Sequence, residues 1–427
     1  MATLWAAAII WISWQIERSN TTQLLGLFAV AFAAYIWLVR HATDNRSLIC
    51  LAILVRVAIV PTFPLLSDDI WRFIWDGRLT LAGISPLAYT PEQLLSSGLA
   101  PANLDVQLLN LLNSPTHFTI YPPICQWIFS GACWLSGDSN YLAAVYMKAT
   151  LCSFDIGTII LLPRLLTALG QPTKNIFWYA LNPLIIIEIC GNAHFEGALI
   201  FGVIAALYLL IVAQKYWWSA TLMHLAVSAK LLPLLFAPFW IRRYGLLKTI
   251  GYWGIVGGLL LLTWWPDLSV AAAHLADSIN LYFRRFEFNA GLYYLCREIG
   301  FYTLGYNLNR TLGPALGGAA ALYICWVAWR DRDPASHRNL PQLMLWAISG
   351  YLWCTAIMHP WYTALPLALA TLTPYRFAMV WTGTAVLSYT AYTTAPVHEN
   401  YWLIALEYAA VWGCAIYEFR RQTQRLG

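Results

Sequence analysis

Apolar runs long enough to cross a lipid bilayer recur along the whole chain and limit what it can fold into. Between them lie short polar connections, so that 60% of the 427 residues are hydrophobic and only 11% are charged. A soluble domain has about 25% charged residues, and it cannot bury this much apolar surface. The composition therefore excludes a soluble enzyme, a nucleic-acid-binding protein and a disordered chain, and it predicts an integral membrane protein.

The apolar runs are unbroken rather than alternating, which predicts helices and an all-α fold. Dividing the length by the size of one span with its connection gives about 11–13 crossings. No polar region long enough for a soluble domain interrupts the chain, so we expect one polytopic domain over 1–427. The apolar segments lie at 3–14, 22–39, 47–66, 119–136, 140–168, 176–191, 197–213, 217–240, 249–265, 311–329, 341–358, 361–373, 376–393 and 401–418.

Basic residues indicate which connections lie inside, because cytoplasmic loops retain Lys and Arg. They gather around 40–46, 164–174, 215, 242–248, 330–338, 376 and 420–425. With these connections inside, the long polar connections 67–118 and 266–290 lie outside.

The predicted topology fails to alternate in two places. Two apolar segments separate external Pro123 from internal Arg164, where one crossing is needed. One apolar stretch separates internal Lys215 from internal Arg242, where an even number is needed. A broken or re-entrant helix resolves each case. Irregular backbone at membrane depth is tolerated only where protein or a water-filled cavity surrounds it. Broken helices therefore tend to mark a substrate site. We expect the second break at 230–233, before or at a proline.

The densest polar cluster opens the first external loop, 67–118. Asp68 and Asp69 follow a serine and suit the positive N-terminus of a helix. Asp68, Arg72 and Asp76 are spaced at i, i+4 and i+8, so they share one helix face. Apolar residues cover the adjacent faces, which predicts an amphipathic helix lying on the bilayer interface. Paired carboxylates beside an arginine can act as a general base or hold a metal ion, although a salt-bridged surface helix has the same pattern.

Further ionisable side chains stand within or at the ends of apolar segments, where a charge is costly and usually faces a cavity or a partner. Four of them share the side of the 67–118 loop and are candidates for function: His194, Glu196, Lys230 and His359. For Lys148 and Asp155 we favour pairing with neighbouring helices. The external segment 281–300 is amphipathic, and its Arg284 and Arg285 could meet a lipid phosphate.

Taken together, these motifs resemble those of a known superfamily. Residues 67–72 (SDDIWR) and 75–78 (WDGR) resemble the first external loop of the GT-C glycosyltransferases. The closer likeness is to the polyprenol-phosphate-mannose-dependent mannosyltransferases and their family-87 relatives. Further matches follow in the expected order: Tyr121-Pro-Pro, Asn182-Pro-Leu with Glu188, Gly191-Asn-Ala-His194, Lys230-Leu-Leu-Pro, Phe288-Asn-Ala-Gly and His359-Pro-Trp-Tyr362. Glu196 stands where the family often has Asp, and Trp71 stands where it more often has Tyr.

The resemblance implies a GT-C-type bundle with amphipathic helices in the first external loop. It implies an inverting transferase that moves a hexose, with mannose the first choice, from a polyprenyl phosphate to an acceptor hydroxyl on a glycolipid, glycan or protein. The reaction would take place on the periplasmic or outer face of a membrane, which we expect to be the bacterial inner membrane.

The same resemblance implies that Asp68 or Asp69 is the catalytic base. The side chains expected to bind substrate are Arg72, Asp76, Arg78, Tyr121, Glu188, His194, Glu196, Lys230, Arg284, Arg285, Asn289, His359 and Tyr362. The two adjacent carboxylates could also hold a divalent cation such as Mg²⁺ or Mn²⁺. A donor with a single phosphate needs such a metal less than a nucleotide sugar does.

Three other functions share parts of this pattern. A transporter or flippase of lipid-linked sugars would share the spans and the broken helices, but it would not need the Asp pair in an external loop. A polymerase or ligase of lipid-linked glycans would use a pyrophosphate donor in similar chemistry. A non-catalytic membrane protein would leave the polar motifs on one side unexplained.

Overall fold

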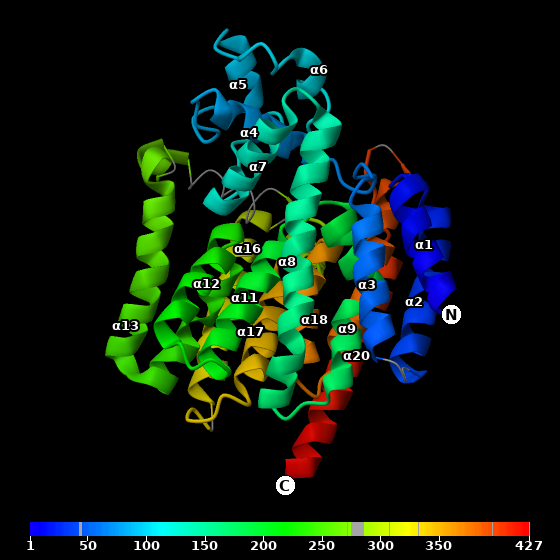
Figure 1. Cartoon of the computed structure of the whole chain (residues 1–427). Coiled ribbons are helices and arrows are strands. Elements are labelled where there is room, and N and C mark those ends of the chain that lie inside the picture. Colours follow the sequence, from blue (N-terminus) through cyan, green and yellow to red (C-terminus); the bar gives the residue numbers. More distant parts are fainter. Residues whose placement is uncertain are drawn as a thin grey trace.

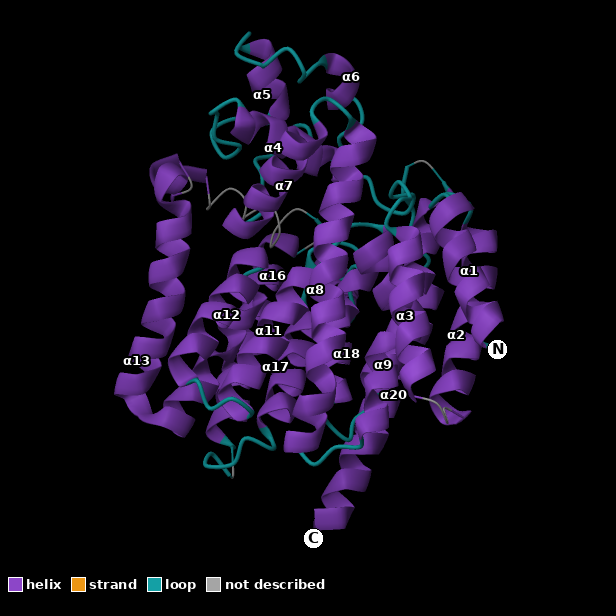
Figure 2. Ribbon diagram, in the orientation of Figure 1, coloured by secondary structure: helices purple, strands orange, loops and turns teal. Residues whose placement is uncertain are grey.

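The computed structural model describes residues 1–41, 45–270, 272–274, 286–306, 308–331, 333–394 and 396–426. These residues are mainly helical, and the β-structure among them is one isolated parallel bridge between Phe288 and Ile357. The helices stand side by side in a bundle, with α4 to α7 above one end and the C-terminal helix projecting from the other (Figures 1 and 2). We call these the α4 end and the opposite end.

The elements of the bundle are, in chain order, α1 (Ala2–Gln15), α2 (Thr21–His41), α3 (Asn45–Ile59), α4 (Asp69–Leu81), α5 (Pro91–Ser96), α6 (Val106–Leu109), α7 (Pro123–Ser136), α8 (Asn140–Ala168), η1 (Thr173–Asn175), α9 (Ile176–Ala180), α10 (Pro183–Ile185), η2 (Ile186–Gly191), α11 (Glu196–Ile211), α12 (Tyr216–Ala229), η3 (Leu232–Phe236), α13 (Ala237–Trp264), η4 (Trp265–Asp267), α15 (Leu292–Leu304), α16 (Asn309–Trp329), α17 (Leu340–Cys354), η5 (Pro360–Thr363), α18 (Ala364–Thr371), α19 (Phe377–Thr384), η6 (Ala385–Thr393) and α20 (Tyr401–Leu426).

The length and composition of the helices confirm an all-α membrane protein. Among the described residues, 4 helices are long and apolar enough to span a membrane, or up to 5 if a bent pair counts as one span. The four are Thr21–His41, Asn140–Ala168, Leu232–Trp264 and Arg310–Trp329, and the pair is Pro183–Gly191 with Glu196–Ile211, bent by 113°. Other apolar helices, such as α1, are shorter. A total of about 11–13 crossings stays a prediction.

The break expected at 230–233 is the tip of a re-entrant hairpin. The ring of Tyr216, at the start of α12, lies 4.8 Å from that of Tyr244 and 5.2 Å from that of Tyr252. The two ends of the apolar stretch 217–240 therefore lie at the same height in the bundle. Between them α12 ends and Lys230 adopts an extended conformation before η3. At 1.5 Å per helical residue, the tip lies roughly 20 Å from the opposite end.

Helix α7 accounts for the other place where the topology fails to alternate. The Ile124 amide donates to Ser228 Oγ over 3.3 Å, and the Cys125 thiol lies 3.3 Å from the Ala229 carbonyl oxygen. The first turn of α7 therefore rests on the tip of the re-entrant hairpin, while α8 runs the height of the bundle beside it (Figure 1). Of the two apolar segments 119–136 and 140–168, only the second passes through the bundle.

The prediction that α4 lies on the bilayer interface is wrong. Its apolar residues Ile70, Ile74 and Trp75 are buried, and the helix packs against α7. At Gly77 an added Cβ would lie 2.6 Å from the Phe129 carbonyl oxygen, so a glycine permits this close approach. The face that reads as lipid-binding in the sequence therefore binds another helix of the same loop region.

Two buried polar contacts join the helices beneath α4, as expected for Lys148 and Asp155. Asp155 of α8 accepts hydrogen bonds from Arg56 of α3 and from the Tyr179 hydroxyl of α9, both over 2.5 Å. Lys148 Nζ contacts the Thr62 carbonyl and hydroxyl oxygens and the carbonyl oxygen at the end of α3. The second contact fixes the turn that leads to Asp68.

Candidate functional site

Asp68 and Asp69 stand side by side at the N-terminus of α4, and their partners differ. Asp68 is the N-cap residue, and its carboxylate forms an ion pair with Arg18 from the connection between α1 and α2. Asp69 Oδ1 accepts a hydrogen bond over 2.7 Å from Asn113 Nδ2. One carboxylate is therefore bound by a cation and the other by a neutral amide.

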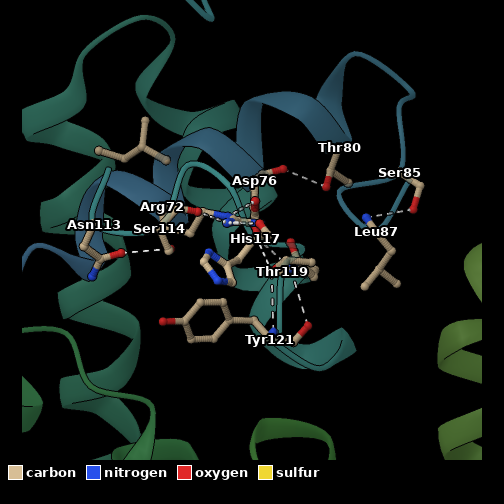
Figure 3. A network of polar contacts seen from close by, with 12 residues as sticks. Arg72, Asp76, Thr80, Ser85, Leu87, Asn113, Ser114, His117, Thr119 and Tyr121 are labelled. Atoms are coloured by element: carbon tan, nitrogen blue, oxygen red, sulfur yellow. Dashed lines mark hydrogen bonds and ion pairs between the residues drawn. The ribbon is translucent and has the colours of Figure 1, made fainter. Parts of the chain in front are cut away.

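Arg72 and Asp76 belong to a closed network that holds the first loop together (Figure 3). Arg72 donates to Asp76 over 2.8 Å and to the His117 carbonyl oxygen over 2.9 Å. Asp76 also accepts from the Thr119 hydroxyl over 2.5 Å and from Gln126 over 3.1 Å. Both members of the ion pair are buried, and these contacts are within the protein. These contacts give Arg72 and Asp76 a structural role in the loop, and their part in substrate binding stays a prediction.

Arg78 and Tyr121 also lie in the framework of the loop. Arg78 donates to the carbonyl oxygens of Asn103 and Asp138 over 3.0 and 2.8 Å, which ties α4 to the start of α8. The ring of Tyr121 meets that of Phe73 edge to face at 4.9 Å. The geometry gives both residues a packing role, and their part in substrate binding stays a prediction.

Glu188, His194 and Tyr389 form a buried polar group. The segment 183–191 is not the plain helix that its apolar run suggests, because it passes into the π-helical η2 before the chain turns at 192–195. Glu188 in η2 accepts from the Tyr389 hydroxyl over 2.7 Å, and its other oxygen lies 3.0 Å from His194 Nδ1. Such π-helical turns occur frequently at functional sites.

A stack of aromatic rings leads from His194 across the bundle. Trp361 lies between His194, at 3.7 Å, and His359, at 4.4 Å, with near-parallel rings. Phe288 continues the stack 4.9 Å from His359. His194 Nε2 and His359 Nδ1 are buried without a hydrogen-bond partner among the described residues. Because buried polar atoms are normally paired, these nitrogens are candidates for contact with a ligand.

Lys230 at the re-entrant tip joins this stack from the other side. Its ammonium lies 2.6 Å from Glu196 and 3.6 Å from the centre of the Tyr362 ring. His359 meets the same Tyr362 ring edge to face at 5.4 Å. His359 lies in the connection between α17 and η5, outside the spans, and burial together with nearby Lys230 lowers its pKa to about 3. It is therefore neutral at ordinary pH and can exchange hydrogen bonds but not supply charge.

Arg18 connects the carboxylates to these rings. Its guanidinium lies 4.2 Å from the centre of the Tyr392 ring, and that ring lies 5.8 Å from Phe288. A continuous line of contacts thus runs from Asp68 through the aromatic stack to Lys230. No sequence pattern pointed to Arg18, Tyr389 or Tyr392, and Trp361 entered only as part of the motif at 359–362. The available signal for Arg18 was a basic residue in a connection that the topology places outside.

Asn289 lies beside this line of contacts rather than in it. Asn289 donates to Glu407 over 3.1 Å and to the Met358 carbonyl oxygen over 3.3 Å, so it fixes the 286–291 segment to α20 and to the His359 connection. Arg284 and Arg285 lie outside the described residues.

The carboxylates at the start of α4 do not fit a divalent cation. A metal site needs several oxygen ligands that converge, whereas Asp68 faces the guanidinium of Arg18 and Asp69 faces an amide N–H. In the described part of the chain no group of three or more His, Cys, Asp and Glu side chains is placed to hold a metal ion.

A family model described as alpha-(1->6)-mannopyranosyltransferase, N-terminal domain, matches residues 3–244, which is more than half of the chain. The chain belongs to this family. The protein is thus a mannosyl-transferring glycosyltransferase with membrane-spanning helices, as its motifs indicate. No curated protein and no solved structure matches the chain.

The matched part of this mannosyltransferase contains much of the site. Arg18, the two adjacent aspartates, His194 and Lys230 all lie within residues 3–244. The other three rings of the aromatic stack, Trp361, His359 and Phe288, lie beyond it. Membership of the family favours transferase chemistry over the transporter or flippase, because the family is described by the sugar that it transfers.

Proposed function

We propose that the protein transfers mannose from a polyprenyl phosphate to an acceptor hydroxyl at the α4 end, by a single inverting displacement with Asp68 or Asp69 as the general base. The α4 end would face the periplasm or cell exterior, with the protein in a bacterial inner membrane. The observation that carries the proposal is the pair of carboxylates at the start of α4, connected through the aromatic stack to Lys230.

This arrangement suits the three parts of such a donor. The polyprenyl tail is lipid-soluble and can enter between apolar helices. The phosphate needs a cation, which Lys230 supplies at the re-entrant tip. The sugar needs polar partners, and His194 Nε2 and His359 Nδ1, on either side of Trp361, are buried without a hydrogen-bond partner among the described residues.

In the proposed step the acceptor oxygen forms a bond to the anomeric carbon while the carboxylate takes its proton. The bond between the anomeric carbon and the phosphate oxygen breaks, and its electron pair stays on the phosphate. Negative charge therefore grows on the leaving polyprenyl phosphate, where a fixed cation stabilises it more than in the ground state.

The test is transfer of labelled mannose from synthetic polyprenyl-phosphate-mannose to membrane acceptors by the purified protein in lipid. A general base contributes about 10²–10⁴-fold, so Asp68→Asn or Asp69→Asn should reduce transfer by that amount, and the variant that does so identifies the base. Asp138→Asn is the matched control, because Asp138 is an exposed aspartate of the same external region.

Two outcomes would contradict the proposal. Wild-type transfer by the Asp68→Asn, Asp69→Asn double variant would exclude both carboxylates as the base. Transfer of mannose from a nucleotide sugar, with none from any polyprenyl phosphate, would exclude the donor class.

A further inference from the structure

The ion pair of Arg18 with Asp68 is exposed enough to exchange partners. The Arg18 side chain is 27% exposed and that of Asp68 is 46% exposed. By contrast, both members of the Arg56 and Asp155 pair are fully buried. Water competes with an exposed ion pair and makes it weak, whereas a buried pair resists separation. A substrate anion can therefore replace Asp68 as the partner of Arg18 at small cost.

Arg18 does not depend on Asp68 for its position. Its guanidinium lies over the Tyr392 ring, at 4.2 Å, which is a favourable cation–π distance. Its backbone amide donates to the Leu65 carbonyl oxygen over 3.2 Å, which ties the α1–α2 connection to the segment before α4. The cation would therefore stay in place when its carboxylate partner changes.

Arg18 also faces the part of the site where a phosphate is expected. It lies close enough to His359 to contribute to the lowered pKa of that imidazole, as does Lys230. Tyr392 and Phe288 form the connection between Arg18 and His359. An anion bound beside His359 would therefore have Arg18 on one side and Lys230 on the other. The charge of Lys230 is already neutralised by Glu196.

We propose that Arg18 binds the phosphate of the donor, and that Asp68 is its counter-ion only while the site is empty. On donor binding the phosphate replaces the Asp68 carboxylate as the partner of the guanidinium, and the Asp68 carboxylate is released to act as the base. This inference rests on the proposed function and deepens it, because it assigns Asp68 rather than Asp69 as the base.

The charges balance through the reaction. The phosphodiester of the donor carries one negative charge, and Arg18 pairs with it on binding. During transfer the acceptor's proton passes to Asp68, which becomes neutral and no longer needs a cation. The electron pair of the broken bond stays on the phosphate, so the charge that Asp68 loses is gained where Arg18 is bound.

Binding of a polyprenyl phosphate without sugar tests the exchange separately from transfer. We would titrate a short-chain polyprenyl phosphate into the purified full chain in lipid and measure its Kd calorimetrically. An exposed ion pair is worth a small free energy, so Asp68→Asn should bind the probe about two- to five-fold more tightly than the wild type. Arg18→Gln should bind it about tenfold more weakly, and Arg18→Lys should fall between because it keeps the charge but loses the fork of donors.

The controls separate a specific partner from general charge. Asp69→Asn removes the same charge one residue away but leaves the Arg18 pair intact, so its Kd should change less than twofold. The Arg18→Gln, Asp68→Asn double variant should not show the tighter binding of Asp68→Asn, because it has no guanidinium to bind the phosphate.

Each contradictory result has its own meaning. Equal tightening by Asp68→Asn and Asp69→Asn would overturn the exchange, as would Arg18→Gln binding with the wild-type Kd. Either result would leave the proposed polyprenyl-phosphate donor uncontradicted. A wild type that does not bind the probe would overturn the donor class in the proposed function, and this inference with it.

Discussion

Removal of the Lys230 ammonium tests whether the re-entrant tip serves the reaction. Lys230→Met keeps the length of the side chain but removes the charge that lies 2.6 Å from Glu196. A unit charge about 4 Å from a developing negative charge interacts by about 4 kcal/mol at an effective dielectric constant of 20. The opposing charge of Glu196 and the 29% exposure of the lysine side chain reduce this value. We expect a loss of about 1.4–2.7 kcal/mol, which is about 10–100-fold in kcat.

The same substitution also affects folding, and the two effects must be separated. Glu196 is only 4% exposed, so the single variant leaves a buried carboxylate without its cation, which destabilises the fold. The double variant Lys230→Met, Glu196→Gln removes both charges. It should regain most of the thermal stability but not the turnover.

Initial rates of mannose transfer and thermal unfolding would be measured on the same preparations. Lys215→Met is the matched control, because Lys215 is exposed at the other end of α12. It should leave both quantities unchanged. A double variant with the wild-type kcat would refute a role of the ammonium in the reaction and reduce the pair to a packing contact.

Other perturbations probe the supports of the site. Asp155→Ala should lower the free energy of unfolding by about 3–5 kcal/mol, measured by denaturant titration, because it leaves the buried guanidinium of Arg56 unpaired. Lys148→Met should slow mannose transfer, because the turn at Thr62 loses its hydrogen bonds to the ammonium. A wild-type transfer rate would show that the turn keeps its conformation without Lys148. Chelation by EDTA should leave the transfer rate unchanged, and restoration by Mg²⁺ after a loss would contradict this. Because burial lowers the pKa of His359, the unfolded chain binds an extra proton below about pH 6.5. Stability should therefore fall as the pH drops from 7 to 5, and less so in His359→Gln.

Features that depend on neighbours in sequence could be predicted, and the helix α4 is an example. Its start follows from an acidic pair that suits a helix N-terminus, and the contact between Arg72 and Asp76 follows from their spacing of four residues. The break at Lys230 could be inferred because charge in the flanking connections demands an even number of crossings. In each case a local pattern decides a local structure.

Features that depend on which segments meet could not be predicted. The apolar side of α4 packs against α7 instead of lipid, and a hydrophobic face by itself does not distinguish the two environments. The contact of Arg72 with the carbonyl oxygen of His117, 45 residues away, follows from the fold and not from any local pattern. Arg18 and Asp68 stand 50 residues apart, and no spacing rule connects them.

The breaks in the helices explain why the site forms where it does. A continuous helix within a membrane pairs its own backbone groups and can offer side chains only from its flank. A turn inside the bundle exposes backbone and lets a polar residue project from its tip, provided that protein surrounds it. Three such tips meet here, and each brings one ionisable residue to the rings around Trp361: His194, Lys230 and His359. Residues that are far apart in the sequence therefore become neighbours because their helices stop at the same depth. Substitutions that disturb one tip should affect the other two through the shared rings.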